Sequence, residues 1–458
     1  MKLKLFLLST IFIVGVNQVF AQYIRNPESI TIGTMSPTGV SNSGEIALYK
    51  AQSSPYFIWN PEKNITTEIG GTSPGLGNGG LATFSNDGKF ISGVSVNAVT
   101  SKFEAARYDV VANKWTTLGS FDYSLDNTAG SAYNISGDGN TLVGLSYYPG
   151  GGSTHGFAWN TTKGVIDLGS LHAGRNTRAN EVNADGSVIV GWQDQVGNWK
   201  SAVWKKNADG GYFPNQYLLI NSSGSATDPN NQLGEADAVS GDGKWIGGRG
   251  DFAMMNAWLW NQEAGMIDLG RVDEDSRTKG DVTSINHDGS IAIGYYSTFR
   301  GQGQPTLYQA FIWTKKDGRM DLNDFLKNKL KFDLGGDIIY VPNQISQNGK
   351  YITGWGRSAE NKSITFRIQL PDNFLATDEV KSTTEVTLYP NPVNNILNID
   401  AKEQITSISV YNLTGQQIFT KTMNTKTSTV DMSAYKAGVY IVEVNSNANT
   451  KAYKVIKK

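Results

Sequence analysis

Short apolar runs separated by glycine-containing polar turns occupy most of the chain. One motif recurs seven times. It consists of an apolar residue, then Ser or Asn, then any residue, then a polar residue followed by Gly, and an apolar run comes after it. Asp-Gly or Asn-Gly between two apolar runs predicts a tight β-hairpin, because Gly accepts the positive φ that such turns require. The seven turns are Asn42-Ser43-Gly44, Asn86-Asp87-Gly88, Gly137-Asp138-Gly139, Ala184-Asp185-Gly186, Gly241-Asp242-Gly243, His287-Asp288-Gly289 and Gln347-Asn348-Gly349.

An aromatic segment follows each hairpin, as in Phe157-Ala158-Trp159, and then a fourth short run that often ends in Leu-Gly. Four short strands in each repeat of about 40 to 60 residues are typical of a propeller blade. The pattern therefore predicts an all-β fold with a seven-bladed β-propeller, with six or eight blades as alternatives. The recurring Trp59, Trp159, Trp204, Trp260 and Trp313 are expected to pack between neighbouring blades.

The two ends of the repeat region predict how the propeller closes. The seventh repeat runs into Pro371 without a fourth strand, whereas Ser29–Thr34 reads as an extra strand ahead of the first hairpin. An N-terminal strand that completes the last blade would remove exposed sheet edges.

Strand parity predicts where the variable loops lie. The connections from first to second and from third to fourth strands share one face and are short here. The remaining connections share the opposite face and are expected to be long; examples are Tyr147–Thr154, Gln193–Lys200, Asn221–Gly234 and Ser297–Tyr308. Binding residues are expected on that rim, because loops on a rigid scaffold usually carry function.

The N-terminus has the pattern of a secretion signal. Lys2 and Lys4 precede an apolar run, and small residues close the segment before Gln22. We expect a signal peptide over residues 1–21, cleaved between Ala21 and Gln22. A membrane anchor is the alternative, but the run is short for a span. The mature chain is then expected to have no transmembrane segment.

The amino-acid composition excludes several classes of function and of site. The chain has 458 residues, 40 basic and 41 acidic residues, three His and no Cys. Balanced charge gives no field that would recruit nucleic acid, and the absence of Cys excludes disulfides and thiolate zinc sites. We expect no metal, no cofactor, no nucleic-acid partner and a monomer.

The tail changes in character after Pro371. Residues 371–385 are polar and read as a linker that follows a propeller over residues 22–370, and residues 386–458 alternate strands with Gly turns. The tail contains Tyr389-Pro390-Asn391-Pro392, then Val410-Tyr411-Asn412-Leu413-Thr414-Gly415, then Gly438-Val439-Tyr440-Ile441-Val442. We expect a small immunoglobulin-like β-sandwich.

This tail resembles the type A C-terminal sorting domain of Bacteroidetes proteins, whose motif would include Pro390, Asn391, Pro392, Gly415, Gly438 and Tyr440. The resemblance implies export by Sec and then by the type IX secretion system, with the protein secreted or attached to the outer-membrane surface. The repeat itself, through His155-Gly156-Phe157-Ala158-Trp159 and the following Val165-Ile166-Asp167-Leu168-Gly169, resembles the extracellular HAF repeat. That second resemblance implies a fold and no activity.

Candidate binding residues on the predicted loop rim are Tyr147, Tyr148, Trp192, Trp199, Arg249, Tyr295, Tyr296 and Trp355. Exposed rings there could stack on sugars or anchor a protein. Arg249-Gly250-Asp251 matches an adhesion tripeptide, but an ordinary loop turn explains it better.

No catalytic constellation is visible in the sequence. Glu181, Glu235, Asp237 and Asp281 lie in or just before first strands, and His172 and Arg178 are expected in a rim loop. Solvated surface positions are expected for all of them. The predicted function is therefore a non-catalytic glycan- or protein-binding module. A polysaccharide hydrolase or lyase is the alternative, and it requires carboxylates that converge.

Overall fold

The computed structural model describes residues 22–26, 36–75, 79–121, 130–147, 153–195, 198–213, 216–219, 232–250, 256–273, 275, 277–371, 374, 386–412, 416–446 and 450–458. The chain divides into two compact units, residues 1–372 and 373–458. The predicted signal peptide, most of the predicted linker and the segment Ser29–Thr34 lie outside the described residues.

Seven antiparallel sheets make up the described part of the first unit. The first contains β2 (Ser36–Val40), β3 (Ile46–Tyr49), β4 (Tyr56–Asn60) and β5 (Ile65–Gly70). The second contains β6 (Phe90–Val96), β7 (Phe103–Asp109) and β8 (Lys114–Thr117), and Phe84 bridges to Ile91 beside β6. The third contains β9 (Gly130–Ile135), β10 (Thr141–Tyr147), β11 (Thr154–Asn160) and β12 (Gly164–Asp167).

The remaining sheets follow the same order. The fourth contains β13 (Thr177–Val182), β14 (Val188–Gln195), β15 (Asn198–Lys205) and β16 (Gln216–Leu218). The fifth contains β17 (Ala236–Val239), β18 (Trp245–Gly248), β19 (Trp258–Asn261) and β20 (Gly265–Asp268). The sixth contains β21 (Thr278–Ile285), β22 (Ile291–Thr298), β23 (Leu307–Thr314) and β24 (Gly318–Asp321), followed by α1 (Leu322–Asp324) and η2 (Phe325–Lys329). The seventh contains β25 (Ile338–Ile345), β26 (Tyr351–Arg357), β27 (Ser363–Gln369) and the N-terminal β1 (Gln22–Arg25).

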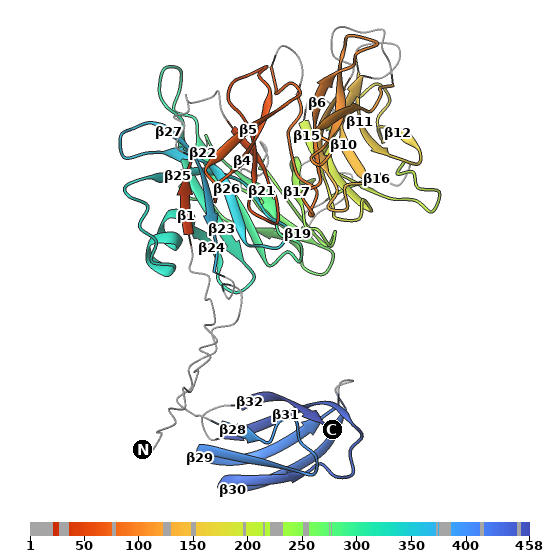
Figure 1. The fold of residues 1–458 in the computed structure, drawn as a ribbon. Coiled ribbons are helices and arrows are strands. Elements are labelled where there is room, and N and C mark those ends of the chain that lie inside the picture. The colour runs from red at the N-terminus through yellow and green to blue at the C-terminus, as the bar shows by residue number, and fades with distance from the viewer. Residues whose placement is uncertain are drawn as a thin grey trace, which may run out of the picture. The chain divides into compact units, whose positions relative to one another are not determined.

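Successive sheets pack face to face, and the seventh returns to the first through β26 and β2 (Figure 1). The first strands of neighbouring sheets contact one another from β9 through β13, β17, β21 and β25 to β2, which places them innermost around a common axis. The all-β, propeller-like fold that the repeat pattern predicts is confirmed. Because strands alternate in direction, the Asp-Gly turns lie at one end of the sheets, here called the turn end, and the long connections lie at the other, the loop end.

The predicted hairpin turns are confirmed at all seven positions. Each turn Gly has a positive φ, from 65° at Gly289 to 87° at Gly44. The Ser or Asn that opens the turn holds the turn Asp or the next strand; for example, Ser240 Oγ donates to Asp242 Oδ1 at 2.7 Å, and Trp245 N donates to Ser240 Oγ. This explains why the repeat keeps both residue types at fixed spacing.

The N-terminal strand closes the last sheet, although not with the predicted segment. Gln22–Arg25 pairs antiparallel with Phe366–Gln369 and occupies that edge, whereas Ser29–Thr34 lies outside the described residues. Tyr23 Oη donates to Asp337 Oδ2 at 2.7 Å, which ties this strand to the start of β25. The prediction that an N-terminal strand completes the last sheet is therefore confirmed. The predicted position of that strand is wrong, because Gln22–Arg25 forms it.

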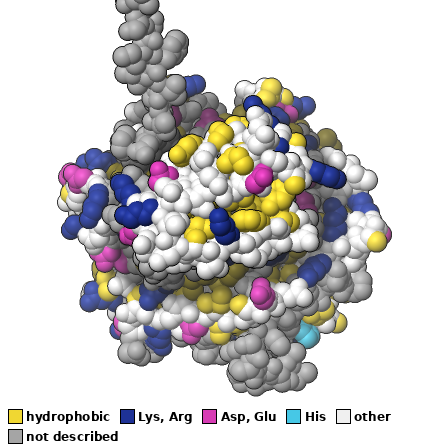
Figure 2. Space-filling view, turned by 90° about the horizontal axis from the view of Figure 1, so that it is seen from below, with side chains coloured by type: hydrophobic (Ala, Val, Ile, Leu, Met, Phe, Trp, Pro, Cys, Tyr) yellow, Lys and Arg dark blue, Asp and Glu magenta, His cyan; other side chains and the backbone are white. Residues whose placement is uncertain are grey.

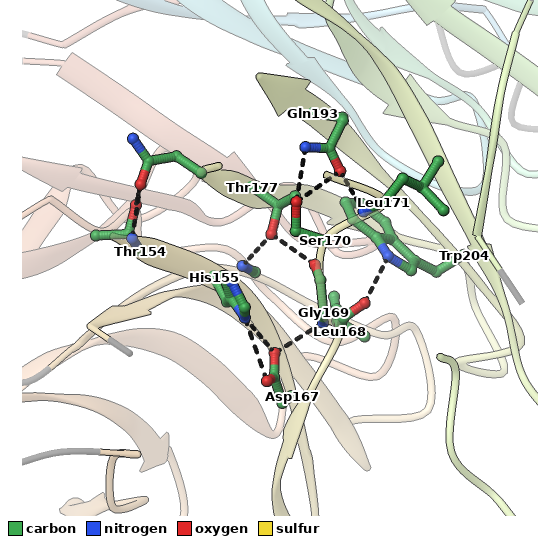
Figure 3. A network of polar contacts seen from close by, with 12 residues as sticks. Thr154, His155, Asp167, Leu168, Gly169, Ser170, Leu171, Thr177, Gln193 and Trp204 are labelled. Atoms are coloured by element: carbon green, nitrogen blue, oxygen red, sulfur yellow. Dashed lines mark hydrogen bonds and ion pairs between the residues drawn. The ribbon is translucent and has the colours of Figure 1, made fainter. Parts of the chain in front are cut away.

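The His-x-Phe-x-Trp resemblance corresponds to a contact between third and fourth strands. His155 Nδ1 lies 2.9 Å from Asp167 Oδ1, which also accepts from Gly169 N at 2.7 Å (Figure 3). Trp204 Nε1 donates across to Leu168 O of the preceding sheet at 3.0 Å. The tryptophan set therefore packs between sheets as predicted at Trp204, and Trp59 and Trp313 are also buried, whereas Trp159 and Trp260 are half-buried.

The second unit forms one antiparallel sheet in its described part. It contains β28 (Val386–Tyr389), β29 (Ile396–Tyr411), β31 (Gly438–Ser446) and β32 (Thr450–Lys457) in that order, and β30 (Gln417–Asp431) pairs with the other edge of β29. Its core includes Val393, Leu397, Ile408, Val430 and Val442. The immunoglobulin-like sandwich stays a prediction. Among the described residues of the chain, no helix has the length and apolar character to cross a membrane.

Candidate functional site

A bulge interrupts the first strand of six sheets at the same place. The residues left out of the pairing are Thr38, Tyr133, Asn180, Asp237, Thr283 and Asn343. Three of them donate to a main-chain carbonyl of the next sheet: Thr38 Oγ1 to Ala82, Asn180 Nδ2 to Ala236 and Thr283 Oγ1 to Pro342. Bulges re-aim side chains, and at these three positions the re-aimed side chain joins neighbouring sheets. Asp237, the bulged residue of the fifth sheet, accepts hydrogen bonds from Asn180 Nδ2 and Arg249 Nε.

Asp237 belongs to a charged cluster near the loop end, formed by Arg178, Glu235, Asp237, Arg249 and Asp281. Arg249 Nε lies 2.8 Å from Asp237 Oδ2 and 3.6 Å from Glu235 Oε2. Its Nη2 lies 3.4 Å from Asp281 Oδ2. One guanidinium at the end of β18 thus gathers three carboxylates from two adjacent sheets.

Glu235 joins this arrangement to the fourth sheet. Its Oε1 forms an ion pair with Arg178 Nη2 and accepts from Asn180 Nδ2 at 3.0 Å. Arg178 Nε in turn donates to Asn180 Oδ1 at 2.7 Å. Glu235 is 3% exposed, so a buried carboxylate holds both arginines.

Burial changes the acidity of these carboxyl groups. Burial is the main cause that raises the pKa of Asp237 to about 7, while the Arg249 guanidinium acts in the opposite direction. Burial likewise raises the pKa of Glu235 and of Asp281, and that of Glu181, deeper on β13, to about 8. The expectation that these four carboxylates are solvated surface groups is wrong, because all four are buried or nearly so.

Two polar atoms at this site have no hydrogen-bond partner. They are Asp281 Oδ1, in a residue that is 7% exposed, and Trp192 Nε1. An unsatisfied buried polar atom costs about 1–3 kcal/mol, and others occur elsewhere in the described part of the chain, for example Trp59 Nε1.

Aromatic rings lie on both sides of the charged cluster. On one side the Arg178 guanidinium lies 5.0 Å from the Tyr133 ring and 5.5 Å from the Trp192 ring, which stacks on Trp199 at 4.4 Å. On the other side Tyr295, Tyr308, Tyr340 and Trp355 form a connected group with ring centroids 5.1 to 6.0 Å apart. Two aromatic platforms therefore flank a fixed polar centre.

Residues 387–458 match the secretion system C-terminal sorting domain. The sorting domain indicates export through the type IX secretion system and carries the secretion and surface-attachment signal of that route. The comparison with curated proteins gives no match.

Three solved structures illustrate the likeness of fold. Oligogalacturonate lyase from Vibrio parahaemolyticus is 11% identical over 78% of this chain and 98% of its own, with a TM-score of 0.47. The β-propeller domain of the Trilobed protease from Pyrococcus furiosus is 11% identical over 76% and 95%, with a TM-score of 0.42. PorZ, a surface component of the type IX secretion system of Porphyromonas gingivalis, is 13% identical over 92% and 70%, with a TM-score of 0.27. The chain spans about half, 53%, of the length of TolB from Acinetobacter baumannii. At these scores no likeness carries an argument about function.

Within the sorting domain, the predicted motif residues hold the strands together. Asn391 Nδ2 donates to Lys454 O at 2.9 Å, and Ile456 N donates to Asn391 Oδ1 at 2.8 Å, so the segment with Pro390 and Pro392 closes on β32. Gly438 begins β31, and Tyr440 Oη donates to Lys436 O. Gly415 lies outside the described residues.

The predicted rim residues have different environments. Trp199 is 50% exposed and covers Trp192, which is 5% exposed, because β14 and β15 continue to Gln195 and Asn198 instead of opening into the predicted long loop. Tyr296 is buried and its hydroxyl donates to Gly270 O, so its predicted exposure is also wrong.

The other predicted rim residues remain near the loop end. Tyr147, Tyr295 and Trp355 are half-buried, whereas Tyr148 and Asp251 lie outside the described residues. Arg249 turns toward the carboxylates described above. Ala21 is outside the described residues, and Gln22 begins β1.

Sequence reasoning missed Tyr133, Asn180, Tyr308 and Tyr340. The signal for Tyr133 and Asn180 was their common place in the first strand of each repeat, two residues before the apolar residue that precedes the turn.

Figure 2 shows one face of the molecule, where hydrophobic side chains gather in patches among polar ones and basic side chains are dispersed. Over the described ranges, no group of three or more His, Cys, Asp or Glu side chains is arranged as a metal site.

Proposed function

We propose that this protein is a type IX-exported surface or secreted protein whose first unit is a seven-bladed β-propeller that binds a glycan near its loop end. The observation that carries the proposal is the charged cluster between two aromatic platforms. Sugar rings stack on aromatic faces, while their hydroxyl groups bond to charged side chains of fixed orientation. Both elements occur together here.

Several finer points belong to the same proposal. Each of the seven sheets is taken as one blade, the repeat as an HAF-type repeat, and residues 386–458 as an immunoglobulin-like sandwich. Residues 1–21 are taken as the signal peptide and residues 371–385 as the linker between the units. A protein ligand at the same place is the other form of the binding hypothesis.

A glycan array probed with the full secreted protein tests the binding site. Trp355→Ala and Trp199→Ala each remove a ring from one platform, and we expect either to weaken binding of a retained glycan by about tenfold, as the loss of a stacked ring implies. Phe213→Ala is the matched control, since Phe213 is 44% exposed and follows β15 on the turn-end side. Unchanged binding in both Trp variants would overturn the proposed place of binding.

A polysaccharide hydrolase or lyase is the second candidate, and one observation favours it. Glu235, Asp237 and Asp281 do converge, each within 3.6 Å of Arg249, and the pKa of Asp237 is raised to about 7, as suits a general acid or base at neutral pH. Release of reducing ends from a bound polysaccharide, abolished in Asp237→Asn, would establish catalysis. Binding without turnover supports the binding module.

A further inference from the structure

We infer that the glycan is acidic and that its carboxylate binds between Arg178 and Arg249. This inference rests on the proposed function and names its ligand class. It starts from the way in which the two guanidinium groups use their N–H donors.

Each arginine has one guanidinium nitrogen that makes no hydrogen bond or ion pair with the described residues. Arg249 uses Nε and Nη2 on Asp237, Glu235 and Asp281, and its Nη1 has no hydrogen bond or ion pair with the described residues. Arg178 uses Nε on Asn180 and Nη2 on Glu235, again leaving Nη1. The Arg249 side chain is 45% exposed and the Arg178 side chain 22% exposed, so solvent reaches both side chains.

The two arginines are fixed before any ligand arrives. Glu235 contacts both of them, through Oε1 to Arg178 and Oε2 to Arg249, and Asn180 braces Glu235 and Arg178 together. The Nη1 atom of each arginine carries N–H donors that can form charge-assisted hydrogen bonds with a carboxylate oxygen, and donors held in place lose little entropy on binding. Two such groups joined by one buried carboxylate form a built receptor for an anion.

Carboxylates outnumber arginines at this site, so the affinity for an anionic ligand should depend on pH. The charged or titratable groups around Asp237 are Glu181, Glu235, Asp281, Arg178, Arg249 and Tyr295. Because burial raises the pKa of Asp237 to about 7, and raises those of Glu235 and Asp281, the cluster takes up protons near neutral pH. Each proton removes a negative charge beside the arginines, so an anionic ligand binds more tightly as pH falls.

The aromatic platforms favour a sugar as the carrier of that carboxylate. Trp199 is half-exposed on the Arg178 side, and Tyr308 and Trp355 lie on the Arg249 side, where Tyr295 joins them to Asp281 and Arg249. Rings on both sides suit flat sugar faces on either side of an acidic group.

A hexuronic-acid oligosaccharide and its fully methyl-esterified form, titrated into the full secreted protein by calorimetry, test the inference. The ester keeps every ring and every sugar hydroxyl but removes the charge. We expect the acid to bind about tenfold or more tightly than the ester, as charged hydrogen bonds imply, and to bind more tightly at about pH 6 than at about pH 8.

Three variants test whether the two arginines themselves bind the carboxylate. Arg178→Gln should lower the affinity for the acid to near that of the ester, and Arg249→Lys, which keeps the charge that the buried carboxylates require, should lower it in part. Lys244→Gln is the control, because Lys244 lies on the same sheet at the turn end and is 76% exposed. Thermal unfolding of each variant verifies that it is folded.

The outcomes distinguish this inference from the proposed function. Equal or weaker binding of the acid than of the ester, with loss of both in Trp355→Ala, would overturn the acidic ligand and keep the binding site. Binding of polyglutamate in place of the oligosaccharide would assign the site to an acidic peptide and overturn the sugar. Binding that no Arg or Trp variant alters would overturn both.

Discussion

Arg367 donates a hydrogen bond from Nη2 to Gln22 Oε1 at 2.8 Å, across the pair of strands that closes the last sheet. Arg367 has no exposed surface, and its Nη2 also lies 2.6 Å from Glu62 Oε1 of the first sheet. Its Nε and Nη1 have no hydrogen-bond partner among the described residues, although the guanidinium lies 5.0 Å from the Tyr351 ring. A buried charge with a single carboxylate partner thus stands where the seventh sheet meets the first.

Removing that partner should be costly. Glu62→Gln leaves the buried guanidinium without a counter-charge, and because the Glu62 side chain is 60% exposed we expect a loss of about 1–2 kcal/mol in the free energy of unfolding. Arg367→Met, which removes the charge and keeps the volume, should cost less than Glu62→Gln, since two unsatisfied nitrogens leave with it. Urea unfolding of the full chain measures both.

Glu68→Gln serves as the control, because Glu68 is an exposed residue of β5. Its effect should remain within about 0.5 kcal/mol. A larger loss for Arg367→Met than for Glu62→Gln would show that the arginine stabilises the closure by itself.

Stability should fall as pH rises from about 5 to about 8. The folded chain keeps protons on Asp237, with a pKa of about 7, and on Glu181, with a pKa of about 8, while the unfolded chain releases them at a lower pH. The stabilisation is therefore complete only below about pH 4, where the unfolded carboxyl groups are also protonated, and it is lost as pH rises through the raised values. Thermal unfolding midpoints across this range measure it.

Glu181→Gln should flatten that pH dependence, because the amide does not titrate. Carboxyl groups with lowered pKa values, such as Asp275 at about 2, act only in stronger acid and leave this window unaffected. A midpoint that rises between pH 5 and 8 would contradict the buried, proton-retaining cluster.

His155→Asn should preserve stability where His155→Ala does not. In the fifth sheet, Asn256 Nδ2 donates to Asp268 Oδ1 at 2.8 Å, and Gly270 N donates to the same oxygen, which reproduces the His155–Asp167–Gly169 arrangement. We expect His155→Ala to cost about 1–3 kcal/mol, and His155→Asn clearly less, by chemical denaturation. Equal losses would show that the ring packing, and not the contact with Asp167, matters.

The repeat chemistry could be predicted because each signal is local. A turn Asp and Gly, a Ser or Asn that caps them, and an aromatic third strand all act within a few residues, so the hairpins around Gly139 or Gly243 follow directly. The closing strand was harder, because Gln22–Arg25 and Ser29–Thr34 both have sequences typical of a short strand, and only the pairing of Gln22–Arg25 with β27 identifies the strand that closes the sheet.

The charged cluster could not be predicted from spacing. Glu235 and Arg178 are 57 positions apart and meet only because two sheets are adjacent and a bulge turns Asn180 toward them. Trp192 was misplaced for a related reason: whether β14 ends or continues depends on its pairing with β15.

Deleting residues 386–458 should stop export across the outer membrane, because the sorting domain carries the signal for the type IX route. We expect the truncated protein, detected with an antibody to residues 22–370, to accumulate in the periplasm. Asn391→Ala removes the hydrogen bonds of Asn391 with Lys454 O and Ile456 N. We expect this variant to show a partial defect in export. Surface display of the truncated chain at the normal level would refute the role of this domain.

A structure of the secreted protein with a bound uronic-acid oligosaccharide tests the central claim most directly. We predict sugar rings against Trp199 or Trp355 and a carboxylate on the free nitrogens of Arg178 and Arg249. An oligosaccharide at the turn end, or one that contacts only residues 386–458, would contradict the account.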